Sequence, residues 1–174
     1  RYSVLRVWID KDLRQGVPFF IFTDALKILD SVTIYHRMEK TSEEWVKKNG
    51  GGIFELHSYA VPDDFPQEEI RNQFLKEFEE YFPEIRGYKL KYEYLQVKDD
   101  FTAFHTNLYK TRPTVKTEVE NLFLAGDWVK LENPAMLMEA ATTSALYAAN
   151  SIFTKEGLIQ ESLYSVPLKG IFTD

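Results

Sequence analysis

Residues 121–128 read Asn-Leu-Phe-Leu-Ala-Gly-Asp-Trp, and this stretch decides how the last third of the chain is interpreted. The apolar run over 121–125 is short, and it stops at Gly126 and Asp127. Apolar runs of this length bounded by turn residues are typical of buried strands. The sequence therefore predicts a strand over 121–125 and a tight turn directly after it.

A long helix is expected to follow that turn. Residues 134–141 read Pro-Ala-Met-Leu-Met-Glu-Ala-Ala, and the apolar, alanine-rich character continues to about residue 153. Asn133 is a favourable N-cap and Pro134 a favourable first helical residue, whereas Gly157 is a favourable stop. Because the sequence is apolar on nearly every side, we expect the helix to be buried on most sides.

A strand that ends in Gly-Asp before a helix start has the chemistry of a cofactor site. Glycine lets a ligand approach the backbone, and a helix start offers unpaired N–H donors. The carboxylate of Asp127 can accept hydrogen bonds from ligand hydroxyl groups. From the residues alone, an ordinary strand and helix with a solvent-facing aspartate is the stronger interpretation.

The two stretches resemble the closing signature of the flavin-dependent carotenoid desaturases of the amine oxidase superfamily. That signature has a strand with Leu-Ala-Gly-Asp, then a loop, then Met-Glu-Gly-Ala at the start of a helix. Arg112-Pro113 occupies the position of an Arg-Pro pair in that family. The order of elements agrees over nearly the whole chain, but only the last third is specific. Residues 127–141 are most similar to the branch with the isorenieratene synthase-like enzymes.

The resemblance implies FAD as the cofactor and a set of residues that face it. Gly126 would let the backbone meet the pyrophosphate and ribityl region, and Asp127 would hydrogen-bond there. The backbone N–H of Met138 would point at the pyrimidine carbonyl of the flavin ring. Trp128 and Pro134 complete the implied cofactor-binding set.

The sequence departs from the family pattern in two ways. Ala140 and Ala145 stand where the family has glycines, and we expect this to cause a modest shift of the site. No G-x-G-x-x-G fingerprint occurs, although that motif holds the ADP half of FAD. We therefore expect an incomplete FAD site, a colourless isolated polypeptide, and a missing N-terminal part of the parent protein as partner.

The fold class expected for the chain is α+β. Residues 1–97 would form part of a substrate-binding domain, with a mixed or antiparallel sheet and a covering amphipathic helix. Residues 98–174 would be the C-terminal portion of an FAD-binding domain, with a strand and the long helix of a Rossmann-like fold. In the first part, alternation and composition predict strands over 2–9, 31–35, 53–61 and 92–97. The spacing of apolar residues predicts an amphipathic helix over 67–82.

Composition excludes several classes of protein. The chain has 174 residues, a net charge of −6 and no cysteine, so a nucleic-acid partner, disulfides and thiolate metal sites are excluded. No apolar run reaches the roughly 18 residues that span a bilayer. We expect a cytoplasmic or peripheral membrane location. Residues 45–48 are either a membrane-edge segment or, more simply, a surface turn.

A few other residues are weaker candidates. None of the three histidines has metal-ligand spacing, and His105, just before the cofactor segment, is the preferred outside candidate for an active-site residue. The segment 19–22, with Tyr35 and Phe54, either lines a tunnel for a long hydrocarbon or belongs to the sheet core. No metal is expected.

The function implied is that of an oxidoreductase whose parent protein removes a hydride from a hydrophobic polyene, or isomerises one, with FAD as electron carrier. The substrate would be a small hydrophobic molecule of the carotenoid class, and no catalytic residue is assigned. A flavin amine oxidase or hydroxysqualene-type oxidoreductase is the alternative enzyme. A non-catalytic module that binds an apolar ligand or a protein is the alternative from another class.

Overall fold

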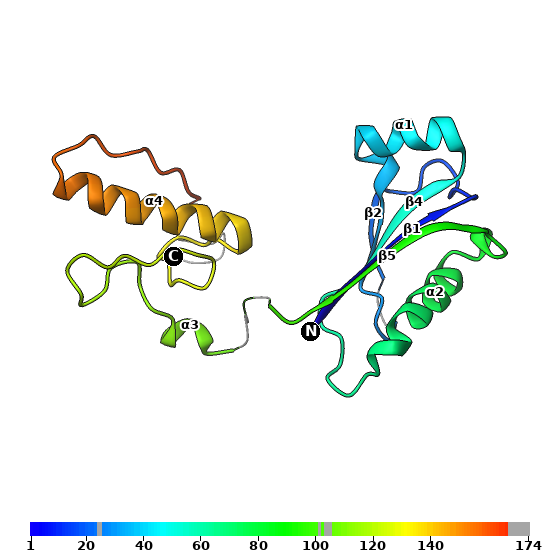
Figure 1. The fold of residues 1–174 in the computed structure, drawn as a ribbon, viewed down its shortest axis with the longest axis horizontal. Helices are drawn as coiled ribbons and strands as arrows, with labels where there is room; N and C mark the ends of the chain where they lie inside the picture. The colour runs from blue at the N-terminus through cyan, green and yellow to red at the C-terminus, as the bar shows by residue number, and fades with distance from the viewer. Residues whose placement is uncertain (24–25, 101, 103–105, 167–174) are drawn as a thin grey trace, which may run out of the picture. The chain divides into compact units, whose positions relative to one another are not determined.

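The computed structural model describes residues 1–23, 26–100, 102 and 106–166. The chain divides into two compact units, Arg1–Phe101 and Thr102–Asp174 (Figure 1). Each unit has its own hydrophobic core.

The first unit is built on a five-stranded sheet in the order β2-β3-β4-β1-β5. Every pairing in it is antiparallel, which confirms the α+β class and the antiparallel sheet. The strands are β1 (Tyr2–Ile9), β2 (Phe20–Phe22), β3 (Ser31–Ile34), β4 (Gly52–Ser58) and β5 (Leu90–Lys98).

Strand β1 lies at the centre of the longest pairings and sets the two faces of the sheet. Its residues alternate between half-buried and buried along its whole length. Leu5 and Val7 lie opposite Leu56 and Phe54 of β4, so the buried residues of both strands share one face. Helix α2 (Ile70–Tyr81) covers this face and contributes Ile70, Phe74 and Phe78 to the core (Figure 1).

The helix predicted over 67–82 is present but composite. A 3-10 turn, η2 (Gln67–Glu69), precedes α2, and a second one, η3 (Pro83–Ile85), follows it. Phe54 is a core residue, whereas Phe20 and Phe22 are 37% and 66% exposed. The apolar segment 19–22 is therefore divided: Ile21 packs against the core, and its two phenylalanine neighbours in β2 lie on the opposite face.

A second helix, α1 (Lys40–Asn49), follows the short 3-10 turn η1 (Tyr35–Arg37). Neither Thr41 nor Ser42 caps α1, although both residue types favour that position. Glu39 is the N-cap, and its carboxylate accepts from the backbone N–H groups of Thr41 and Ser42 at 2.8 and 2.7 Å. Thr41 and Ser42 therefore lie in the first turn of the helix, where their backbone N–H groups donate to the cap.

A buried carboxylate ties α2 to the loop before β3. Glu77 is only 2% exposed. Its oxygens accept hydrogen bonds from the backbone N–H groups of Lys27, Ile28 and Leu29 at 2.8, 3.2 and 2.7 Å. The side chain of Gln73 donates a fourth bond at 2.8 Å. Buried backbone donors need partners, so Glu77 satisfies a segment that would otherwise be costly to bury.

The second unit contains α3 (Leu108–Thr111) and α4 (Leu137–Lys155). The strand predicted over 121–125 is wrong for this structure. Within the described residues, this segment makes a single isolated bridge, Lys116 to Phe123, and no ladder. A strand needs a continuous partner, and here only a loop lies beside it. A Rossmann-like domain is thus not confirmed.

The start of α4 also differs from the prediction. The helix begins at Leu137 with Met136 as N-cap, and neither Asn133 nor Pro134 belongs to it. The Asn133 side chain instead accepts a hydrogen bond from the Tyr147 hydroxyl. The predicted stop is confirmed: Gly157 has a φ of 68°, and the N–H of Leu158 bonds to the carbonyl of Phe153 at 2.8 Å. This is the Schellman pattern of a helix end.

Burial of α4 on most sides is not observed. Its buried residues are Ala140, Thr143 and Ser144, and the small core of the unit lies against that one side. The cause is that only loop segments pack against the helix within the described part of this unit. No helix of the described residues is long and apolar enough to cross a membrane.

Glu77→Gln is expected to lower the free energy of unfolding by about 2 kcal/mol or more, because an amide cannot accept from all of the buried N–H groups. Urea unfolding of the purified chain measures this. Glu80→Gln is the control, since Glu80 lies on the same helix and only pairs with Lys76 at 3.9 Å on the surface. Equal losses in both variants would contradict the role of Glu77.

Glu39→Gln is expected to destabilise the chain at neutral pH and to remove part of its acid sensitivity. Hydrogen bonds from the Ser42 side chain and from the Thr41 and Ser42 backbone lower the pKa of Glu39 from 4.5 to about 2. Its stabilising contribution is therefore complete above pH 4.5 and is lost as pH falls toward 2.

Urea unfolding at pH 7, 4.5 and 2.5 tests this pH dependence. The stability difference between wild type and Glu39→Gln should shrink over that series. Glu43→Gln, which removes only an exposed pair with Lys47, is the control. A difference that stays constant with pH would contradict the cap.

Candidate functional site

The turn at Gly126 has a backbone that only glycine adopts easily. Its φ is 141°, and a Cβ placed there would lie 2.4 Å from Nε1 of Trp128. The carbonyl of Gly126 accepts from the N–H of Val129 at 3.3 Å, which closes the turn. The conformation and the close approach together explain why this position is a glycine.

Ser144 of α4 holds this turn, and it was not singled out from the sequence. Its hydroxyl accepts from the N–H of Gly126 at 2.8 Å and lies 3.0 Å from the carbonyl of the same residue. Ser144 is fully buried. The signature that this helix resembles has a Ser-Gly pair where the chain has Ser144 and Ala145, and that pair is the sequence signal that could have found it.

Asp127 is positioned by two neighbours. Its carboxylate accepts from the Thr102 hydroxyl at 2.8 Å, and its backbone carbonyl accepts from the Arg112 guanidinium at 3.3 Å. Arg112 belongs to the Arg-Pro pair noted in the sequence. The structure thus brings together Gly126, Asp127 and Trp128 in one turn, with Arg112 beside it.

The start of α4 is open. No side chain of the described residues caps it, and the side chain of Met138 is 84% exposed. Leu137 has a φ of 54°, in the left-handed region that non-glycine residues rarely occupy. Uncapped first-turn N–H groups and local strain are features found at ligand sites. No hydrogen bond within the described residues joins Pro134 or Met138 to the Gly126 turn.

These residues fit one half of a flavin site. The helix start offers donors for a carbonyl oxygen, and Asp127 offers an acceptor in the same unit. The space directly beside Gly126 is filled by the indole of Trp128. The sequence has no dinucleotide fingerprint, the motif that holds the ADP half of FAD in other proteins.

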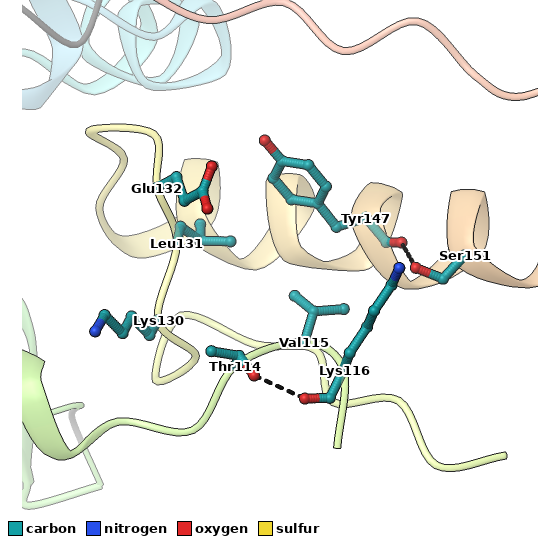
Figure 2. Close-up of a pocket in the computed structure, with 8 residues that line it drawn as sticks. All are labelled: Thr114, Val115, Lys116, Lys130, Leu131, Glu132, Tyr147 and Ser151. Atoms are coloured by element: carbon teal, nitrogen blue, oxygen red, sulfur yellow. Dashed lines mark hydrogen bonds between the residues drawn. The ribbon is translucent and has the colours of Figure 1, made fainter. Parts of the chain in front are cut away.

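A cavity of about 330 Å³ lies elsewhere in the second unit, between two loop segments and α4 (Figure 2). It is lined by residues 114–116 and 130–132 and by Tyr147 and Ser151. None of the predicted cofactor residues lines it. Val115 and Leu131 of the small core form part of its wall, so it is the incompletely filled edge of that core.

The face of the sheet opposite α2 is rich in aromatic side chains. Trp8 and Tyr92 meet edge to face with ring centroids 6.5 Å apart, and Trp45 of α1 meets Tyr92 at 6.4 Å. Tyr92 and Tyr94 are 64% and 60% exposed. We call this the open face; its members are Val4, Arg6, Trp8, Phe20, Phe22, Ser31, Thr33, Ile53, Glu55, His57, Tyr92, Tyr94 and Gln96.

A compact polar group lies in the middle of the open face. Arg6 bonds to Glu55 at 3.1 Å, and its guanidinium lies 4.0 Å from the centroid of the Tyr35 ring. Burial lowers the pKa of His57, although the carboxylate of Glu55 opposes this. The charges of Arg6 and Glu55 offset each other on this face.

Beside this polar group, a pocket of about 400 Å³ opens between the sheet and the start of α1. Its wall includes Trp8, Tyr35 and Trp45. These three rings form the apolar part of a wall that also includes Arg6, Glu39, Thr41 and Ser42. Small-molecule sites combine aromatic surface with a few polar groups in this way.

The histidines do not form a metal centre in the described residues. No group of three or more His, Cys, Asp or Glu side chains is placed to hold a metal ion there. His36 is buried and lies 3.2 Å from Asp12, where it holds a loop. His105, the outside candidate for an active-site residue, lies outside the described residues.

Comparison with known proteins gives the chain a family. The family described as flavin containing amine oxidoreductase matches residues 7–153. The chain is 40% identical over 173 residues to a carotenoid phi-ring synthase of Chlorobaculum tepidum, covering 98% of this chain and 27% of that protein. It is 31% identical over 169 residues to a carotenoid phi-ring synthase of Streptomyces griseus, covering 97% and 33%. The chain spans a third or less of these relatives, and it belongs to the family of flavin-containing amine oxidoreductases.

Proposed function

We propose that this chain forms part of an FAD-dependent oxidoreductase that modifies a hydrophobic polyene of the carotenoid class. The observation that carries the proposal is the similarity, over nearly the whole chain, to two proteins named carotenoid phi-ring synthase. Membership of the flavin-containing family supports the cofactor. The aromatic open face and the Gly126 turn supply the two kinds of surface that such an enzyme needs.

In this proposal the second unit faces the flavin. Gly126 adopts the turn backbone that another residue would strain, Asp127 accepts hydrogen bonds, and the N–H of Met138 donates from the open start of α4. Trp128 and Pro134 form the apolar rim. Bound flavin would supply the electron-accepting ring for hydride removal, and a donor at a helix start favours the added electron density.

The other half of the flavin site is proposed to lie outside these 174 residues. The sequence lacks a dinucleotide fingerprint, and the chain corresponds to 27% and 33% of its two relatives. The wider FAD-binding domain, of which residues 98–174 would be a portion, stays a proposal on the same grounds.

The first unit is proposed to bind the substrate on its open face. A polyene has no hydrogen-bonding group, so it needs an apolar and flat surface rather than a polar cleft. Trp8, Tyr92 and Tyr94 present ring faces and edges there, and exposed apolar patches of this kind mark binding sites. The Arg6–Glu55 pair adds no net charge that would repel a hydrocarbon.

The experiment that tests this function uses the full-length protein that contains the chain, loaded with FAD. It is incubated separately with carotenes and with primary or secondary amines, and the products are separated by chromatography. We expect conversion of a carotene and no reaction of the amines. Oxidation of amines alone would contradict the substrate class, and a full-length protein that takes up no flavin would contradict the redox function.

Gly126→Ala is expected to weaken FAD binding by the full-length protein about tenfold or more, which corresponds to about 1.4 kcal/mol. The added Cβ is strained at a φ of 141° and collides with Trp128. Fluorescence titration with FAD measures the dissociation constant.

Gly157→Ala is the matched control for that substitution. Gly157 also has a positive φ, of 68°, but a Cβ there meets nothing within 4 Å. It should destabilise the end of α4 and leave FAD affinity unchanged. Equal affinity losses in the two variants would show that general strain, and not the turn, matters.

A further inference from the structure

The hydroxyl of Ser144 makes contacts that neither helix formation nor packing requires. It receives the N–H of Gly126 at 2.8 Å, and its own proton faces two acceptors, the carbonyls of Gly126 at 3.0 Å and of Ala141 at 2.9 Å. Serine has one donor and two acceptor lone pairs, so it can accept from the N–H of Gly126 while its single proton is shared between the two carbonyls. Ser144 therefore holds both the N–H and the carbonyl of Gly126, which lies 18 positions away in the sequence.

Another serine of α4 shows what a purely local hydroxyl contact looks like. Ser151 donates to the carbonyl of Tyr147 at 2.8 Å, one turn earlier in the same helix (Figure 2). That bond is the common back-bond of serine in helices. Ser144 makes a similar bond to Ala141 and adds the clamp on Gly126, so the clamp is what distinguishes it.

The clamp fixes the turn from both ends. Ser144 holds the N–H and carbonyl of Gly126, and Val129 closes the turn through its own N–H to the same carbonyl. Asp127 and Trp128 lie between these points. Because glycine has the widest backbone freedom, an unclamped Gly126 would let both side chains change direction.

We propose that Ser144 is a positioning residue for the flavin site. It fixes the Gly126 turn on α4, so that Gly126 and Asp127 stay in register with the N–H donors at the start of that helix. This rests on the proposed function, since it takes the turn and the helix start to be the flavin-facing groups. Preorganised groups of this kind lower the cost of binding because they need no ordering when the ligand arrives.

Ser144→Ala is the variant that removes the clamp. Alanine favours a helix and nearly matches serine in size, so α4 should form normally. Ser144→Cys replaces the hydroxyl with a somewhat larger thiol that is a weak donor and acceptor, and it should act in the same direction and carry the test if the alanine variant does not fold. Ser151→Ala is the matched control on the same helix.

Two measurements separate positioning from general stability. Amide hydrogen exchange at Gly126 should become about tenfold faster in Ser144→Ala, with no change in Ser151→Ala. In the full-length protein, the dissociation constant for FAD should rise about tenfold in Ser144→Ala, which corresponds to about 1.4 kcal/mol. Both are measured well below the unfolding temperature, so a change in global stability alone moves neither.

The outcomes distinguish this inference from the function on which it rests. Faster exchange with FAD affinity within twofold of wild type would overturn the positioning role, while weakened binding in Gly126→Ala would leave the proposed function intact. Unchanged exchange at Gly126 would overturn the clamp itself. A wild-type full-length protein that binds no FAD would overturn both proposals together.

Discussion

The alternation of side chains along β1 is the constraint on which the first unit depends. This strand pairs with β4 on one side and β5 on the other, so its register fixes the faces of three strands at once. Leu5 and Val7 are completely buried under α2, whereas Arg6 and Trp8 are thereby held on the open face. A shift of one residue would exchange the two sets, which would bury a charge and expose the core. The proposed substrate surface is therefore the face of the sheet opposite the one that packs into the core.

The second unit relies on a different device, because its described residues form no sheet. Its small core joins loop residues such as Val129 and Leu131 to Ala140 on one side of α4. Individual hydrogen bonds then pair the backbone N–H and carbonyl groups that neighbouring strands would pair in a sheet. The hydroxyl of Ser144 occupies both backbone groups of Gly126, which a neighbouring strand would otherwise pair.

The sequence predicted the first unit well and the details of the second poorly, for physical reasons. Apolar, β-branched and aromatic composition is a signal that each strand carries alone, so 2–9 and 92–97 were placed within two residues of β1 and β5. The segment 121–125 has strand composition, but a strand exists only with a partner. Asn133 and Pro134 have cap chemistry, yet a tertiary bond from Tyr147 takes the Asn133 side chain. The clamp by Ser144 depends on a contact across 18 residues, which no local pattern encodes.

The exposure of α4 links the composition of the helix to the proposed half-site. Its sequence is that of a helix covered on most sides, and the structure buries one side only. Exposing large apolar side chains such as Met138 carries a cost of roughly 25 cal/mol per Å² relative to burial, so such surfaces usually mark binding sites. The open face of the sheet shows the same feature with Tyr92 and Tyr94. Both exposed surfaces lie where the proposal puts a ligand, the flavin at the start of α4 and the polyene on the sheet. A ligand or a further domain that covered both surfaces would remove them from water. One cause would then explain why both are more apolar than exposed surfaces usually are.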